Sequence, residues 1–190
     1  LREEARQREY AWLTGDVRAE DRATQYGHRA AIVLFTGSAQ TGKTFLARRV
    51  EALLVADSRH AYLLEGENLL QGLDADLSAA DPSFAAERVR RYGEVARLLI
   101  DTGLIVVSTS KTFGINYQRM AEMIRTLVQP APVIAVHMSR AGEEPPPNTD
   151  LHFAGPQDFD AAARQILEEL KRRGVLIQPS GTKSTIQYSI

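Results

Sequence analysis

The stretch from residue 37 to residue 44 constrains the fold of this chain more than any other. Its sequence, Gly37-Ser-Ala-Gln-Thr-Gly-Lys-Thr44, fits the pattern G-x-x-x-x-G-K-[S/T] of a phosphate-binding loop. The residues before it, Ala30-Ala-Ile-Val-Leu-Phe-Thr36, are apolar and rich in strand formers. Apolar side chains at helical spacing follow it: Phe45, Leu46, Val50, Leu53 and Leu54. The motif therefore lies between a buried strand and a helix start, where phosphate binding requires it.

Each part of the motif suits the binding of a nucleoside triphosphate. The glycines let the backbone approach phosphate oxygens closely, and the N–H groups of the loop and helix start point at the anion. Lys43 is expected to reach the β- and γ-phosphates, and the Thr44 hydroxyl to ligate Mg²⁺. A glycine-rich turn that only resembles the motif is the alternative, and the flanking strand and helix argue against it. The predicted cofactor-binding residues are Gly37, Ser38, Ala39, Gln40, Thr41, Gly42, Lys43 and Thr44.

Strand-like and helical segments alternate along the rest of the chain. We expect further strands at residues 60–64, 104–108, 132–137 and 151–153, and helices at residues 1–12, 17–23, 84–102, 117–128 and 158–173. This alternation, without an internal repeat, predicts an α/β fold of the P-loop NTPase class, with a parallel sheet covered by helices on both faces. The expected organisation is a linker and helical lead-in over residues 1–29, the P-loop domain over 30–176 and a tail over 177–190.

Composition narrows the classes of function that the chain can have. The formal net charge of −1 at pH 7 argues against a protein that binds nucleic acid or membranes mainly by electrostatics. The 190 residues contain no cysteine, which excludes disulfides and cysteine-based metal sites. No apolar run approaches the roughly 20 residues of a membrane span, and the charged N-terminus is not signal-like, so we expect a cytoplasmic location. Because Leu1 is not a methionine, we expect the chain to be part of a longer polypeptide.

Four motifs together resemble the adenylyl-sulfate kinase (APS kinase) family, over about residues 17–176. They are the phosphate loop, Tyr62-Leu-Leu-Glu-Gly-Glu-Asn68 followed by Gly72-Leu73, Arg90-Arg-Tyr-Gly-Glu-Val-Ala96, and Gly103-Leu-Ile-Val-Val107. In the family, the second and third motifs are Y-L-L-D-G-D-N-x-x-x-G-L and R-R-x-G-E-V-A. In addition, Trp12-Leu-Thr-Gly-Asp16 is similar to the linker that joins a sulfate-adenylyltransferase GTPase subunit to its kinase domain in fused proteins.

The resemblance implies a kinase that uses ATP and Mg²⁺ to phosphorylate the ribose 3′-hydroxyl of adenylyl sulfate, giving PAPS and ADP in sulfate assimilation. Lys43 would serve the phosphates, and Glu65, at the carboxyl end of the second strand, would orient or deprotonate the hydroxyl. The substrate-binding residues that it implies are Glu67, Asn68, Arg88, Arg91 and Lys111. The expected partners are ATP or ADP, adenylyl sulfate and the rest of a sulfate-activation polypeptide. A homodimer is an assembly that the sequence leaves open.

The chain departs from the family pattern mainly on the acceptor side. Glu65 and Glu67 replace two aspartates. One extra methylene moves a carboxylate by roughly 1.5 Å, and a misplacement of ~1 Å can cost ~100-fold in rate. Leu70 replaces an arginine, and residues 110–114 lack the proline and arginine of a substrate-lining segment. Only residues 139–148 stand where the family has a much longer lid, which excludes water and completes the site.

These departures support two alternative hypotheses. In the first, the chain is a degenerate APS kinase-like domain, weak or inactive as an enzyme, with a nucleotide-binding, regulatory or structural role. In the second, it phosphorylates another hydroxyl compound, recognised through residues 110–114. Turnover of adenylyl sulfate tests the first hypothesis, and ADP release with other hydroxyl acceptors tests the second.

Overall fold

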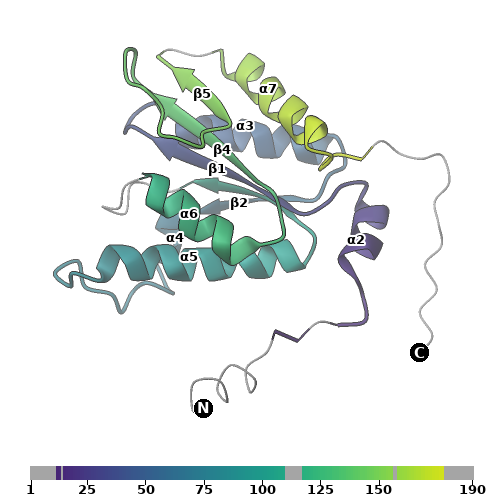
Figure 1. Cartoon of the computed structure of the whole chain (residues 1–190), viewed down its shortest axis with the longest axis horizontal. Helices are drawn as coiled ribbons and strands as arrows, with labels where there is room; N and C mark the ends of the chain where they lie inside the picture. The colour runs from purple at the N-terminus through teal and green to yellow at the C-terminus, as the bar shows by residue number, and fades with distance from the viewer. Residues whose placement is uncertain (1–11, 14, 110–116, 156–157, 178–190) are drawn as a thin grey trace.

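The computed structural model describes residues 12–13, 15–109, 117–155 and 158–177, and its centre is one parallel sheet (Figure 1). The five strands lie in the order β2-β3-β1-β4-β5. Their bounds are Ala31–Gly37 for β1, Ala61–Glu65 for β2, Ile105–Thr109 for β3, Val133–Ser139 for β4 and Leu151–Ala154 for β5. The predicted strands are confirmed, with ends that shift by at most two residues. Because every strand pair is parallel, all carboxyl ends lie at one edge of the sheet, on its left-hand side in Figure 1.

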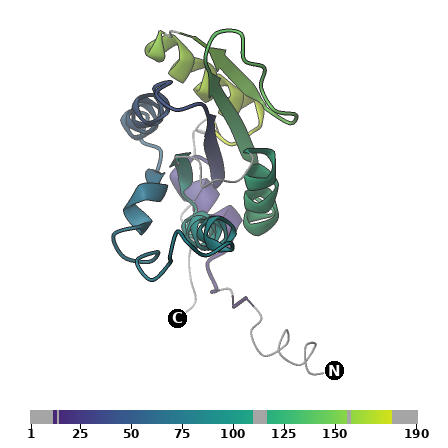
Figure 2. The same cartoon turned by 90° about the vertical axis from the view of Figure 1, so that its left-hand side faces the viewer.

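Helices cover both faces of this sheet, as predicted. They are α2 (Ala19–Tyr26), α3 (Lys43–Ala56), α4 (Gly66–Leu69), α5 (Phe84–Asp101), α6 (Tyr117–Val128) and α7 (Phe159–Arg172). Helices α3 and α7 lie on one face, and α5 and α6 on the other (Figure 2). No helix within the described ranges combines the length and apolar character that crossing a bilayer requires. Residues 1–11 of the helix predicted over residues 1–12, and residues 178–190 of the tail predicted over residues 177–190, lie outside the described residues.

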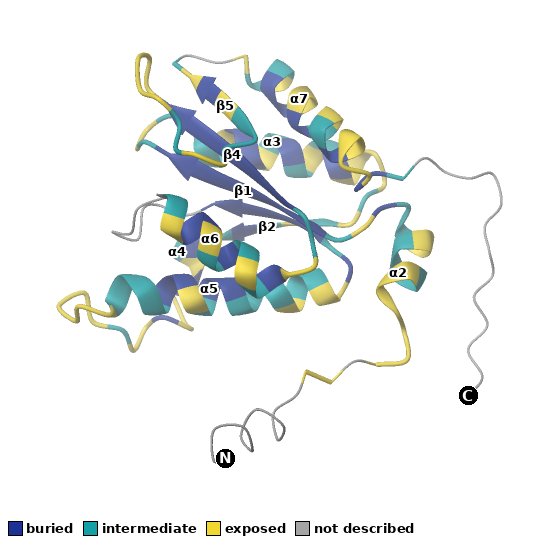
Figure 3. Ribbon diagram, in the orientation of Figure 1, coloured by how far each residue is buried: buried dark blue, intermediate teal, exposed yellow. Residues whose placement is uncertain are grey.

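The central strand β1 is apolar because both of its faces are covered. All seven of its residues are buried, and the sheet forms the buried centre of the molecule in Figure 3. Val33 and Phe35 pack toward α3 and α7, whereas Ile32 and Leu34 pack toward α5 and α6. Each such side chain contributes roughly 1.5–3 kcal/mol when fully buried. This burial holds the phosphate loop, which leaves the carboxyl end of β1, on a rigid support.

The segment before β1 is attached to the amino-terminal edge of the sheet. His28 is fully buried and forms an isolated antiparallel bridge with Leu176. The His60 backbone N–H donates to His28 Nε2 over 2.9 Å, and the Arg59 guanidinium donates to the Ile177 carbonyl oxygen over 3.1 Å. These contacts connect the residues before position 30 to the end of the P-loop domain. The division at residue 29 stays a prediction.

The His28 contacts predict a loss of stability in mild acid. His28 Nδ1 lies 3.2 Å from the Arg29 carbonyl oxygen, so the neutral ring donates at Nδ1 and accepts at Nε2. Burial lowers the pKa of His28, and the nearby His60 and Arg59 lower it further, while the Arg29 contact opposes the shift. A lowered folded pKa means that this stability is present above the unfolded pKa, near about 6.5, and is lost as pH falls below it.

We therefore expect the midpoint of urea unfolding to occur at a lower urea concentration at pH 5.5 than at pH 7.5. The loss from one group is at most about 1.4 kcal/mol per pH unit. His28→Gln, which cannot titrate, should show a smaller fall over the same range. Equal pH dependence in both proteins would contradict the assignment to His28.

Candidate functional site

Two glycines of the phosphate loop occupy positions that exclude any side chain. Gly37 ends β1 with φ of +120°, and a Cβ there would overlap the carbonyl oxygen of Met138 on β4. Gly42 has φ of +87°, and a Cβ there would lie 2.6 Å from the Phe159 ring. The left-handed conformation and the close approach both require glycine. The loop is therefore fixed between β4 and the start of α7.

The remaining loop residues leave the start of α3 accessible. Ala39 and Gln40 are exposed, and the Thr41 hydroxyl donates to the Ser38 carbonyl oxygen over 2.9 Å. The N-cap of α3 is Gly42, which has no side chain to bond the first N–H groups of the helix. Thr44, half-buried, follows in the first turn. A helix start without a cap, preceded by a glycine-rich loop, fits a bound phosphate group and a Mg²⁺ ligand at Thr44.

Lys43 lies over this loop. Its Nζ donates to the carbonyl oxygen of Gly37 over 2.9 Å and also contacts that of Ser38. Burial lowers the pKa of Lys43, and the nearby Glu67 carboxylate opposes that shift. The ammonium group thus lies between the phosphate loop and the acidic residues that follow β2.

Those acidic residues stand at the carboxyl end of the edge strand. Glu65 is the last residue of β2 and the N-cap of the one-turn helix α4, which contains Glu67 and the exposed Asn68. Glu65 Oε1 lies 3.4 Å from Nη2 of Arg48 on α3. The structure therefore brings Glu65, Glu67 and Lys43 to the same edge of the sheet, as the sequence predicts for a kinase site.

A buried tyrosine holds the ends of β2 and β3 together, and sequence reasoning missed it. The Tyr92 hydroxyl donates to the Leu64 carbonyl oxygen over 2.8 Å and lies 2.6 Å from Ser108 Oγ. Burial raises the pKa of Tyr92, and the nearby Glu67 and Glu65 carboxylates raise it further, while the Ser108 contact opposes the shift. The ring therefore stays neutral and helps to position the end of β2, which carries Glu65. The sequence signal that could have found Tyr92 is its position within the R-R-x-G-E-V-A motif.

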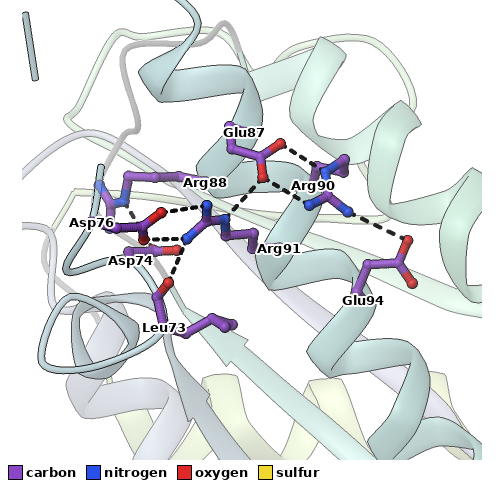
Figure 4. Close-up of polar contacts among 8 residues, drawn as sticks. All are labelled: Leu73, Asp74, Asp76, Glu87, Arg88, Arg90, Arg91 and Glu94. Carbon is purple, nitrogen blue, oxygen red and sulfur yellow. Dashed lines mark hydrogen bonds and ion pairs between the residues drawn. The ribbon is translucent and has the colours of Figure 1, made fainter. Parts of the chain in front are cut away.

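Arg91, predicted to bind substrate, connects the segment after α4 to α5 (Figure 4). Its guanidinium bonds both Asp76 oxygens, over 2.6 and 2.9 Å, and Glu87 on its own helix over 2.9 Å. Hydrogen bonds from Arg90 and Arg91 lower the pKa of Glu87 to about 2. In Figure 4, the contacts drawn for Arg90 are both with residues of its own helix, Glu87 and Glu94.

Arg88, also predicted to bind substrate, is buried beside the same segment. Its Nε lies 3.3 Å from Asp74 Oδ2, and the two side chains are 8% and 1% exposed. The guanidinium also lies over the Phe84 ring, 5.5 Å from its centroid. The structure thus pairs Arg88 and Arg91 each with an aspartate from the segment that follows α4. Lys111, predicted to bind substrate, lies outside the described residues.

The short β4–β5 connection reaches the phosphate loop. Glu143 Oε2 accepts from the Ser38 hydroxyl over 2.5 Å and from the Arg140 N–H over 3.1 Å. The hydrogen bonds from Ser38 and Arg140 lower the pKa of Glu143. On β4, His137 Nδ1 lies 3.0 Å from the Thr36 hydroxyl. Within the described ranges no three acidic, histidine or cysteine side chains group as a metal site.

The sequence and the fold are both similar to known proteins. The profile of the adenylylsulphate kinase family matches residues 29–145. An adenylyl-sulfate kinase from Yersinia pestis is 29% identical over 87% of this chain and 89% of its own length. One from Shewanella amazonensis is 38% identical over 67% of this chain and 63% of its own length.

Solved structures show the same likeness. An APS kinase from Mycobacterium tuberculosis is 29% identical, with a TM-score of 0.66 over 76% of this chain and 99% of that one. A hexameric APS kinase from Thiobacillus denitrificans has a similar fold, at 24% identity and a TM-score of 0.65, over 80% of this chain and 31% of that one.

Proposed function

Since the chain belongs to the adenylylsulphate kinase family, we propose that it transfers the γ-phosphoryl group of ATP to the 3′-hydroxyl of adenylyl sulfate. The observation that carries this proposal is the placement of two groups at one edge of the sheet. Lys43 lies on the phosphate loop at the end of β1, and Glu65 lies at the end of β2. A phosphoryl donor and a hydroxyl acceptor need these two kinds of group side by side.

The phosphate loop supplies charge and hydrogen-bond donors to the donor nucleotide. When phosphate enters, the Lys43 ammonium exchanges its contacts with the carbonyl oxygens of Gly37 and Ser38 for phosphate oxygens. The free N–H groups at the start of α3 point at the same anion. Mg²⁺, held with the nucleotide through the Thr44 hydroxyl, would neutralise charge on the phosphates.

Glu65 acts on the acceptor hydroxyl in this proposal. Its carboxylate accepts the hydroxyl hydrogen bond and so directs the oxygen toward the γ-phosphorus, or takes its proton during transfer. Tyr92 contacts the carbonyl oxygens of Leu64 and Thr109, which fixes the strand end that carries Glu65. Glu67, Asn68, Arg88, Arg91 and Lys111 remain the proposed substrate-binding residues.

The deciding experiment measures PAPS formation by the purified chain with ATP, Mg²⁺ and adenylyl sulfate, separated by anion-exchange chromatography. We expect turnover, and we expect Glu65→Gln to lower kcat by roughly 100-fold, because an amide cannot accept the proton. Binding of ADP without any product from the unaltered chain would instead support the degenerate alternative.

Glu168→Gln is the matched control for Glu65→Gln. Glu168 lies on α7, is 68% exposed and pairs with Lys171, so its loss should leave kcat unchanged within about twofold. Full turnover by Glu65→Gln would show that this carboxylate has no part in the reaction.

We also propose the setting that the sequence resemblance suggests. The chain would act in the cytoplasm within a longer sulfate-activation polypeptide, next to a sulfate-adenylyltransferase GTPase subunit. The similarity of residues 12–16 to the linker in such fusions supports this. A homodimer, readily tested by light scattering, stays a prediction.

A further inference from the structure

Two adjacent arginines on α3 project to opposite flanks of the helix. Arg48 Nη2 lies 3.4 Å from Glu65 Oε1 at the end of β2. Arg49 Nε lies 2.6 Å from Asp160 Oδ1 at the start of α7. Arg48 is four residues after Thr44, so the two side chains share one helix face. Long helical side chains point back toward the helix N-terminus, which directs Arg48 toward the edge where the phosphate loop lies.

The Arg48 guanidinium has donors to spare. It is 68% exposed, and among the described residues Glu65 is its only hydrogen-bond partner. A guanidinium carries five N–H donors in a fork that matches the oxygens of sulfate and phosphate. By contrast, Arg88 and Arg91 already bond carboxylates of the segment after α4.

Besides its hydrogen-bond donors, Arg48 contributes a positive charge at the carboxyl end of the sheet. Glu67 lies close enough to Lys43 to influence its pKa, and Glu65, at the end of β2, adds a second negative charge to the same edge of the sheet. With Arg48 the four side chains sum to zero, and without it they sum to −1. A net negative edge repels an acidic acceptor, and Arg48 removes that repulsion while offering hydrogen bonds.

We propose that Arg48 is a substrate-binding residue that holds the acidic group, sulfate or phosphate, of the acceptor and positions Glu65 beside it. This inference rests on the proposed function for the identity of the acceptor.

The test compares Arg48→Ala, Arg48→Lys and the matched variant Arg49→Ala by calorimetry on the ADP-saturated protein. We expect Arg48→Ala to weaken adenylyl sulfate binding about tenfold while ADP affinity changes less than twofold. Arg48→Lys keeps the charge but loses the fork, so it should restore part of the affinity. Arg49→Ala should bind like the unaltered protein. The difference should shrink at high salt, because the site is exposed.

A second measurement keeps the inference separate from the proposed function. Inorganic sulfate is titrated into ¹⁵N-labelled protein, and the Arg48 Nε–H signal is assigned by its loss in Arg48→Lys. A saturable shift of this signal, absent for Arg49, supports the inference even if no PAPS forms. The inference is overturned if Arg48→Ala binds adenylyl sulfate normally, if it weakens ADP binding by the same factor, or if inorganic sulfate does not shift the Arg48 Nε–H signal.

Discussion

Replacing Lys43 with alanine should lower the rate of PAPS formation by roughly 1,000-fold and leave the fold intact. The half-buried Nζ is the cation of the phosphate loop, and its contacts are with the backbone oxygens of Gly37 and Ser38. A preorganised charge that stabilises the transition state in a partly desolvated site is worth roughly 10²–10³-fold or more. Loss of the ammonium should also weaken nucleotide binding. Single-turnover formation of PAPS and calorimetric titration of ADP measure the two effects.

Lys171→Ala is the control for Lys43→Ala. Lys171 lies near the end of α7, and it is 51% exposed and pairs with Glu168 over 2.7 Å. Its removal takes away the same charge far along the chain from the phosphate loop and should change the rate less than twofold. Equal thermal midpoints for both variants would exclude unfolding as the cause. A rate for Lys43→Ala within tenfold of the unaltered chain would remove the phosphate loop from the proposed reaction.

The fold could be predicted because its signals are contiguous in the sequence. The run from Ala31 to Phe35 is apolar at every position, since β1 is covered on both faces, and this distinguishes a central parallel strand from a half-exposed one. The phosphate loop was equally visible, because one segment carries Gly37, Gly42 and Lys43 at fixed spacing. The ends of elements were predicted less closely, since β4 runs two residues past its predicted end at His137.

The parts of the site that sequence reasoning missed join residues far apart in the chain. Glu143 and Ser38 are 105 residues apart, and Arg48 and Glu65 are 17 apart on different elements. Neither pair forms a motif, because each contact depends on how a helix or loop lies across the sheet. A charged side chain such as Arg48 on the polar side of a helix looks like an ordinary surface residue until its partner is seen.

Arg88 is a residue whose structural role the sequence did not reveal, and its replacement has the largest expected effect on stability. Its charge suggests an exposed ligand-binding residue, yet its side chain is 8% exposed and paired with Asp74, which is 1% exposed. Arg88→Met keeps much of the volume but leaves the Asp74 carboxylate buried without its cation. Breaking a buried pair in this way typically costs about 3–5 kcal/mol. Urea unfolding followed by circular dichroism should show a loss of this size.

The double variant Asp74→Leu, Arg88→Met separates the two roles that Arg88 could have. If Arg88 only holds the segment after α4 on α5, removing both charges should restore most of the lost stability and leave adenylyl sulfate binding close to normal. If Arg88 also binds substrate, stability should return while affinity for adenylyl sulfate stays low. A single Arg88→Met variant as stable as the unaltered chain would contradict the buried ion pair itself. Because stability and adenylyl sulfate affinity are measured on the same variants, comparing the single with the double variant assigns Arg88 to the fold, to the site, or to both.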